Sequence, residues 1–177
     1  MEDIRKDEKV ITATNKLKKE KVEVSINPKM FLLKHFEEEL KKLENTKSDN
    51  LNEDESKLLE QMKKSFKENI DKYTQAKLDA YMVPLKYNDL QMIKNGILEA
   101  LKYTQSFNFD EDIRMKAMIR EEHTLTVYLS LRKKEDMNKK YYDSLEDIAK
   151  EPESTIEELY NIYLENFVLT EEERKNL

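Results

Sequence analysis

Residues 52–81 read NEDESKLLEQMKKSFKENIDKYTQAKLDAY, and this stretch decides the fold class. Asn52 followed three residues later by Glu55 is the pattern of a capping box, which begins a helix. Apolar side chains then recur every three or four residues, the spacing of one helix face: Leu59, Met62, Phe66, Ile70, Tyr73, Ala76, Ala80 and Tyr81. The stretch therefore predicts a single helix over about 53–81.

The preceding segment predicts a second helix, over about 29–45. Asn27-Pro28 is typical of a helix start, because asparagine caps the free N–H groups and proline has none to lose at the first position. The apolar stripe of this helix is Leu33, Phe36, Leu40 and Leu43. Only the polar turn 46–50 separates the two helices, so they must run antiparallel. We expect a helical hairpin over about 29–81.

The composition supports an all-α fold, with a small helical bundle over about 88–169 beside the hairpin. One glycine in 177 residues leaves few of the positive-φ corners that hairpins between short strands need. Capping patterns predict bundle helices that begin near Asn88, Ile113, Asp143 and Ser154. The helix from Ile113 is expected to reach Lys134, although its end also alternates like a strand. Gly96 inside the first of these helices suggests that another helix approaches it closely.

The N-terminal region departs from this pattern. Val22, Val24 and Ile26 alternate with polar residues, which predicts a short, half-buried strand. Its partner is either Val10–Thr14 or no strand at all, in which case the segment is an extended arm laid on the helical body. The chain therefore divides into an arm over 1–27, a hairpin over 28–82 and a bundle over 83–177.

Charge and cysteine content restrict the classes of function. A formal charge of −6 argues against general binding to nucleic-acid backbones, which requires clustered lysine and arginine. The absence of cysteine excludes disulfides and thiolate metal sites. The first residues lack the apolar run of a signal peptide, and no stretch reaches about 18 apolar residues. We expect a soluble protein of the cytoplasm with no membrane contact, or a component of a virion if it is viral.

The residue patterns that usually carry catalysis or bind a metal are absent from this sequence. Neither His35 nor His123 has a glutamate three residues before it, so the paired motif of di-iron helical bundles is absent. The acidic segment 49–60 has Leu51 and no glycine where a calcium loop needs an oxygen ligand and a turn. One glycine cannot build a phosphate-binding loop. We expect no metal, no cofactor and no enzymatic activity.

Two clusters remain as candidates for binding. The last long helix is apolar on nearly all sides, so it is either a core helix or a helix that offers one face to a partner protein or a second copy. The residues of that face are Leu159, Tyr160, Tyr163 and Phe167. The alternative is a nucleic-acid or regulatory surface at Arg132, Lys133, Lys139 and Lys140, next to Tyr141-Tyr142. Basic residues also gather at helix C-termini for electrostatic reasons.

The order of parts after Met82 suggests a family. An extended Val83-Pro84-Leu85 leads into a capped helix, and a long helix follows with Arg114, Arg120 and Arg132 around Leu125-Thr126-Val127. Then come Tyr142-Asp143-Ser144-Leu145-Glu146, a closing helix over 156–163 and Thr170-Glu171-Glu172-Glu173. This layout, over a little more than half of the chain, resembles the tail assembly chaperones of tailed bacteriophages and related contractile particles. The resemblance implies a small helical adaptor that binds the tape-measure protein during tail growth, without catalysis.

Overall fold

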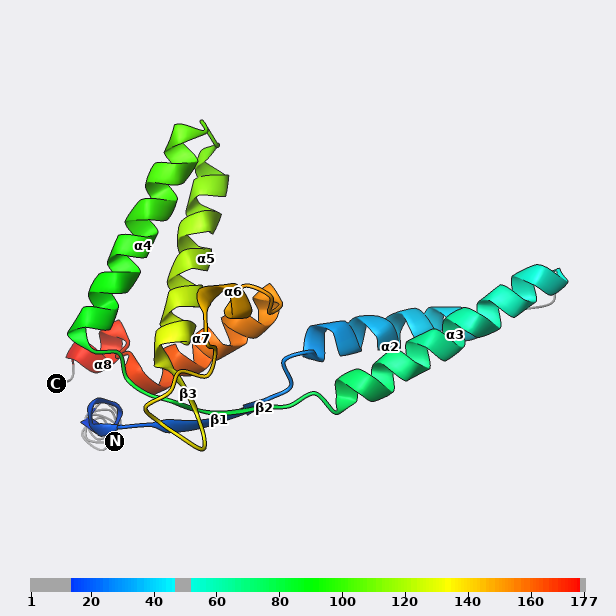
Figure 1. Ribbon diagram of the computed structural model, residues 1–177, viewed down its shortest axis with the longest axis horizontal. Helices are drawn as coiled ribbons and strands as arrows, with labels where there is room; N and C mark the ends of the chain where they lie inside the picture. The colour runs from blue at the N-terminus through cyan, green and yellow to red at the C-terminus, as the bar shows by residue number, and fades with distance from the viewer. Residues whose placement is uncertain (1–13, 47–51, 176–177) are drawn as a thin grey trace, which may run out of the picture. The chain divides into compact units, whose positions relative to one another are not determined.

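The protein is mostly helical, as the sequence predicts, and its described residues form two compact units (Figure 1). The computed structural model describes residues 14–46 and 52–175. One unit is the continuous segment from Ser25 to Leu78, and the other combines the chain up to Val24 with the chain from Asp79 onward. No helix in the described ranges is both long and apolar enough to cross a lipid bilayer.

The first unit consists of helices α2 (Met30–Glu44) and α3 (Glu53–Thr74). The capping box of α3 forms as predicted, since Asn52 Oδ1 accepts from Glu55 N at 2.9 Å and Glu55 Oε2 accepts from Asn52 N at 2.9 Å. The Phe36 ring lies 5.4 Å from the Phe66 ring and 5.7 Å from the Tyr73 ring, which fixes α2 against α3. The prediction of a helix to residue 81 is wrong, because α3 ends at Thr74.

A small sheet corrects the all-α prediction. Its strands are β1 (Val22–Ile26), β2 (Leu78–Met82) and β3 (Leu131–Lys133), in the order β1-β2-β3. In β2 the buried residues Leu78, Ala80 and Met82 alternate with half-buried ones, the period of a strand. Strands β2 and β3 are antiparallel, with Tyr81 opposite Arg132.

The strand predicted over 22–26 is confirmed, but the extended arm laid on the helical body is wrong. Its neighbour is the central strand β2, so it is not an arm laid on helices. The alternative partner strand, 10–14, lies outside the described residues apart from Thr14, which is helical. The helix expected over 113–134 also ends early, because α5 stops at Ser130 and the chain continues as β3.

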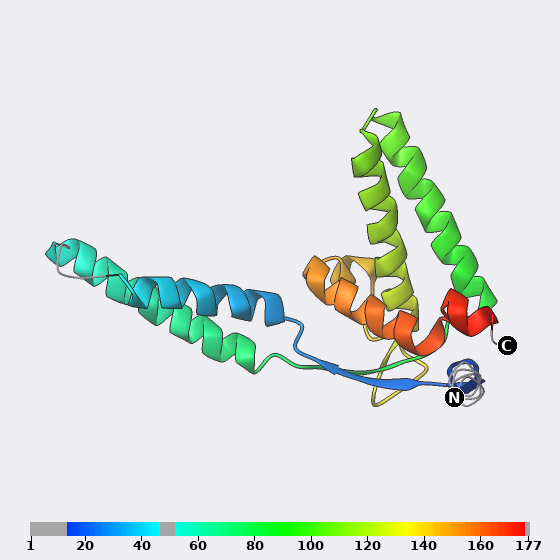
Figure 2. The ribbon, with the colours of Figure 1, turned by 180° about the vertical axis from the view of Figure 1, so that it is seen from behind.

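Two long helices, α4 (Tyr87–Ser106) and α5 (Glu111–Ser130), dominate the second unit and lie side by side (Figures 1 and 2). Ile93 of α4 packs with Leu125 and Leu129 of α5 in a buried cluster. Gly96 faces α5 so closely that a Cβ at this position would overlap Leu125 Cδ1 and lie 3.0 Å from Glu121 Oε1. The predicted close approach of a helix to Gly96 is therefore present.

Three shorter helices follow α5 and β3 in this unit: α6 (Leu145–Ile148), α7 (Glu153–Phe167) and α8 (Glu171–Lys175). Helix α7 packs along α5, where the Tyr160 ring stacks on the His123 ring at 3.9 Å. The core here includes Leu129, Leu131, Ile148 and Leu159, none of which is more than 2% exposed. Large side chains on α4 and α5 nevertheless stay exposed among the described residues, such as Met92 of α4 and Met115 of α5.

Candidate functional site

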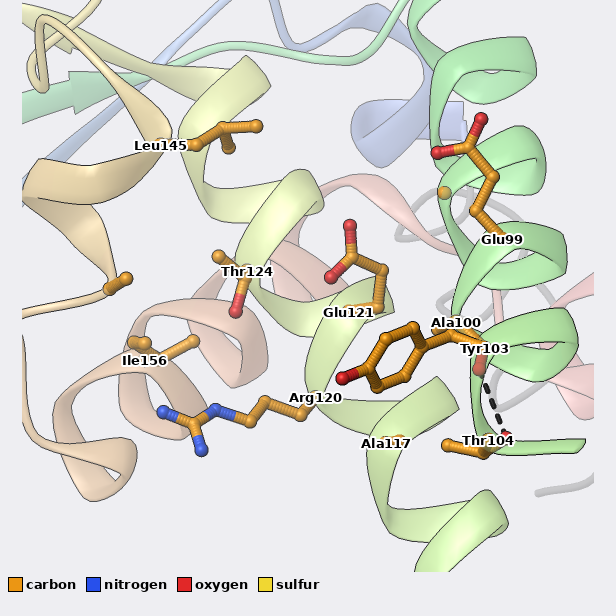
Figure 3. A pocket seen from close by; sticks show the side chains of 12 residues that line it. Glu99, Ala100, Tyr103, Thr104, Ala117, Arg120, Glu121, Thr124, Leu145 and Ile156 are labelled. Atoms are coloured by element: carbon orange, nitrogen blue, oxygen red, sulfur yellow. Dashed lines mark hydrogen bonds between the residues drawn. The ribbon is translucent and has the colours of Figure 1, made fainter. Parts of the chain in front are cut away.

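A groove of about 670 Å³ opens along one side of the α4–α5 pair (Figure 3). Small residues form part of its wall because they let α4 and α5 approach each other: Gly96, Ala100 and Ala117. Leu145, Ala149 and Ile156 contribute apolar surface from α6, the residue after it, and α7. We call this feature the α4–α5 groove.

Polar side chains surround the apolar surface of the groove. Glu99 and Tyr103 come from α4, and Arg120, Glu121 and Thr124 come from α5. In Figure 3, Tyr103 extends from α4 toward α5, whereas Arg120 extends toward the side of Ile156. Arg120 is exposed and forms no ion pair with any residue that the structure describes. Within the described part of the chain, the groove therefore offers an unpaired cation, Arg120, and two carboxylates around an apolar strip.

Three exposed aromatic residues extend the groove toward the α4–α5 turn. Tyr103, Phe107 and Phe109 are 63%, 59% and 37% exposed. Their ring centroids are 4.9 Å apart for Tyr103 and Phe107, and 6.1 Å apart for Phe107 and Phe109. Tyr103 also lines the groove, so the two features are continuous. We call these three residues the aromatic cluster.

The turn that holds the aromatic cluster is built without glycine. Asn108 adopts the left-handed conformation, with φ of 52°, which asparagine tolerates better than most residues. Asn108 N donates to Gln105 O at 3.2 Å, and Phe109 N donates to Thr104 O at 3.3 Å. These two bonds are the Schellman motif that closes a helix C-terminus. Asp110 then caps α5, because its Oδ1 accepts from Ile113 N at 2.9 Å.

The helix face predicted for partner binding lies mostly inside the protein. Leu159 is 0% exposed and Tyr163 is 8% exposed, and the Tyr163 hydroxyl accepts from Leu85 N at 3.3 Å. Tyr160 is half-buried and donates to Glu122 Oε1 at 3.0 Å, and the Phe167 ring packs 5.4 Å from the Tyr163 ring. The sequence left two alternatives for this helix, a core helix or a partner-binding face. Leu159 and Tyr163 fit the core helix, because α5 and the chain at Leu85 already cover them.

Burial and hydrogen bonding also change the acidity of these tyrosines. Burial, followed by the hydrogen bond to Glu122 and the charge of that carboxylate, raises the pKa of Tyr160 to about 12. Burial also raises the pKa of Tyr163, although its hydrogen bond from Leu85 acts in the opposite direction. A phenol is already neutral at physiological pH at its ordinary pKa of about 10, and these shifts keep both hydroxyl groups protonated to higher pH.

The four basic residues of the alternative site come together, because the chain folds back after β3. The backbones of Arg132 and Lys140 form an isolated antiparallel β-bridge, and Lys133 N donates to Lys139 O at 3.1 Å. Three of the four cations are engaged within the chain: Lys133 Nζ lies 2.9 Å from Asp143 Oδ1, Lys139 Nζ lies 3.7 Å from Asp136 Oδ2, and Lys140 Nζ lies 3.9 Å from the Tyr128 ring centroid. Arg132 is half-buried, and burial lowers its pKa.

The groove and the aromatic cluster were not identified from the sequence. The signal that could have found them is the presence of three aromatic residues within the seven positions 103–109. In the described part of the chain, no three histidine, aspartate or glutamate side chains gather as a metal site would require. Comparisons with protein-family models, with curated proteins and with solved structures find no match. The function of the groove is therefore inferred from its own residues.

Proposed function

We propose that this protein works by binding another protein, and that the α4–α5 groove with the aromatic cluster receives an amphipathic helix of that partner. The observation that carries the proposal is the exposure of Tyr103, Phe107 and Phe109 beside an open apolar groove. Exposed aromatic side chains that touch one another are typical of interaction surfaces, since tyrosine and phenylalanine bring large apolar area with few rotatable bonds.

A helix suits this groove for geometric and electrostatic reasons. The walls α4 and α5 flank a strip of small residues, and a third helix can lay its apolar face into such a groove. Arg120 favours an acidic residue on one side of the incoming helix, and Glu99 with Glu121 favours basic residues on the other. The groove contains no histidine or cysteine and no serine, so the proposal is binding without catalysis.

The resemblance to tail assembly chaperones gives this proposal a specific form. In that form the protein is a phage assembly or structural factor that binds its partner through helices, as an adaptor for the tape-measure protein would. The support for the specific form is the order of parts from Val83 onward, and the exposed groove adds support for helix-mediated binding in general.

Site-specific photo-crosslinking tests the proposal. A photoreactive phenylalanine analogue at position 103 is expected to capture one polypeptide in the native source, and the captured peptide should contain apolar residues three and four apart. The double substitution Tyr103→Ser and Phe107→Ser should abolish retention of that polypeptide in a pull-down. Tyr87→Ser is the matched control, because Tyr87 is a 73% exposed tyrosine at the opposite end of the same helix. If the double variant stays folded and retains the partner as well as the control does, the proposal is wrong.

A further inference from the structure

The α2–α3 unit covers its own apolar side chains incompletely. Among the described residues of α2 and α3, Leu33 is the one buried side chain, and the 22-residue helix α3 has none. On α3, Leu58 is 58% exposed and Met62 is 40% exposed. Two helices form a single layer, and a stable domain needs a second layer on its apolar side. This feature is separate from the α4–α5 groove, and the inference does not depend on the proposed function.

The exposed apolar residues of α3 lie on one face of the helix. Leu58, Met62 and Ser65 are spaced by four and by three, so they lie on the same side of the helix. Asp54 and Lys72 are placed by the same spacing at the two ends of this face, near the start and near the end of α3. The face therefore has an apolar middle and ends of opposite charge.

The charges of α3 are distributed unevenly along its length. Residues 53–60 contain four carboxylates and one lysine, whereas residues 63–72 contain four lysines and two carboxylates. An acidic half followed by a basic half is complementary to itself only when a second copy runs in the opposite direction. A parallel copy would place acidic against acidic and basic against basic, which is unfavourable.

We propose that α3 is a self-association surface, on which α3 of a second copy packs antiparallel about a two-fold axis close to Met62. Such an interface uses the same patch on both copies. Leu58 of one copy then lies opposite Ser65 of the second, and Asp54 lies within one turn of the second copy's Lys72. The apolar middle of each face is covered by the other, and each acidic end meets a basic end.

Disulfide crosslinking tests the geometry directly, because the chain contains no cysteine of its own. Met62→Cys should give a covalent dimer on mild oxidation, since both copies present this position at the axis. Leu58→Cys alone should not, because the two positions are separated by about 10 Å along the helices, beyond the reach of about 7 Å between Cα atoms. A mixture of Leu58→Cys and Ser65→Cys should crosslink. Lys67→Cys, on the opposite side of α3, measures the background.

The crosslinking result can contradict the proposal in two ways. If Leu58→Cys crosslinks with itself as efficiently as Met62→Cys, the two helices run parallel and the proposed arrangement is wrong. If no variant crosslinks above the Lys67→Cys background, α3 does not meet a second copy.

Charge reversal gives an independent measurement, by sedimentation equilibrium of the full chain. Asp54→Lys and Lys72→Glu should each raise the dimer dissociation constant at least tenfold, because each change places like charges together at both ends of the interface. An equimolar mixture of the two variants should restore association, since each acidic end again meets a basic end. Lys41→Glu, the same charge change on α2, should leave association unchanged.

The mixture distinguishes a lost interface from a damaged helix, and circular dichroism of each variant confirms that the helices remain. If both variants keep their helical content but their mixture does not regain association, the antiparallel contact is contradicted. A chain that sediments as a monomer up to high micromolar concentration would contradict self-association altogether.

Discussion

Replacing Gly96 with alanine sets helix propensity against packing, and the structure decides which effect is larger. Alanine stabilises a helix interior by about 1 kcal/mol relative to glycine. The new methyl group, however, would overlap Leu125 Cδ1 and lie 3.0 Å from Glu121 Oε1. Leu125 is 5% exposed and packed against Ile93, so it cannot move aside into solvent. Overpacking of a buried site costs about 1–3 kcal/mol, and we expect Gly96→Ala to destabilise this unit by about 1 kcal/mol.

Thermal unfolding of four variants tests this expectation. A loss of about 1 kcal/mol lowers the Tm by about 2–4 °C in a protein of this size. Asn95→Ala, at the exposed neighbouring position, should instead raise the Tm slightly, because it gains propensity without a steric overlap. In a Leu125→Val background, which lacks the Cδ1 atom, Gly96→Ala should become stabilising. If Gly96→Ala raises the Tm equally in both backgrounds, α4 and α5 do not approach as closely as described.

Three further predictions concern single contacts. Asn108→Ala should destabilise the second unit by about 1 kcal/mol, because alanine tolerates a φ of 52° poorly; Asn108→Gly should be neutral or stabilising in the same urea titration. Since folding raises the pKa of Tyr160 to about 12, the folded state holds the phenol proton more tightly than the unfolded chain does. That contribution to stability is complete below about pH 10 and is lost as the pH rises toward 12, so Tyr160→Phe should lose less stability over this interval. Tyr163→Phe removes the acceptor for Leu85 N and should cost about 1 kcal/mol; an unchanged urea midpoint would count against this hydrogen bond.

Helices were more predictable from this sequence than strands, for a physical reason. The capping box at Asn52 and the stripe of α3 report contacts within a few residues of one another. By contrast, β2 and β3 pair residues such as Ala80 and Lys133, which are far apart in the chain. The alternation of Leu78, Ala80 and Met82 was visible, but Ala80 and Tyr81 also fit the helical stripe. The local sequence pattern therefore fits both a helix and a strand at these residues and does not distinguish them.

The end of α5 illustrates a second limit. Leu125, Thr126, Val127, Leu129 and Ser130 are all buried, because this part of the helix has neighbours on several sides. A helix covered all round has no polar face, so its sequence lacks the 3.6-residue period and resembles a strand.

The candidate site shows the same limit at the level of surfaces. Leu159 and Tyr163 have the composition of an interface but are core residues, whereas Tyr103 and Phe107, which no sequence pattern marks as a site, are exposed. Buried and exposed aromatic residues cannot be distinguished by residue type, because the difference depends on which neighbours the fold supplies.

The position of α2 and α3 in the chain, between the paired strands β1 and β2, has a consequence for the order of folding. The sheet cannot close until two points about fifty residues apart meet, and the entropy of such a loop opposes early pairing. The helices remove this obstacle if they form first, because Asn27 Nδ2 donates to Tyr73 O at 2.9 Å and so brings the ends of the loop together. Substitutions that weaken the contact of Phe36 with Phe66 should therefore slow the refolding of the whole chain, including the core around Leu129 in the second unit.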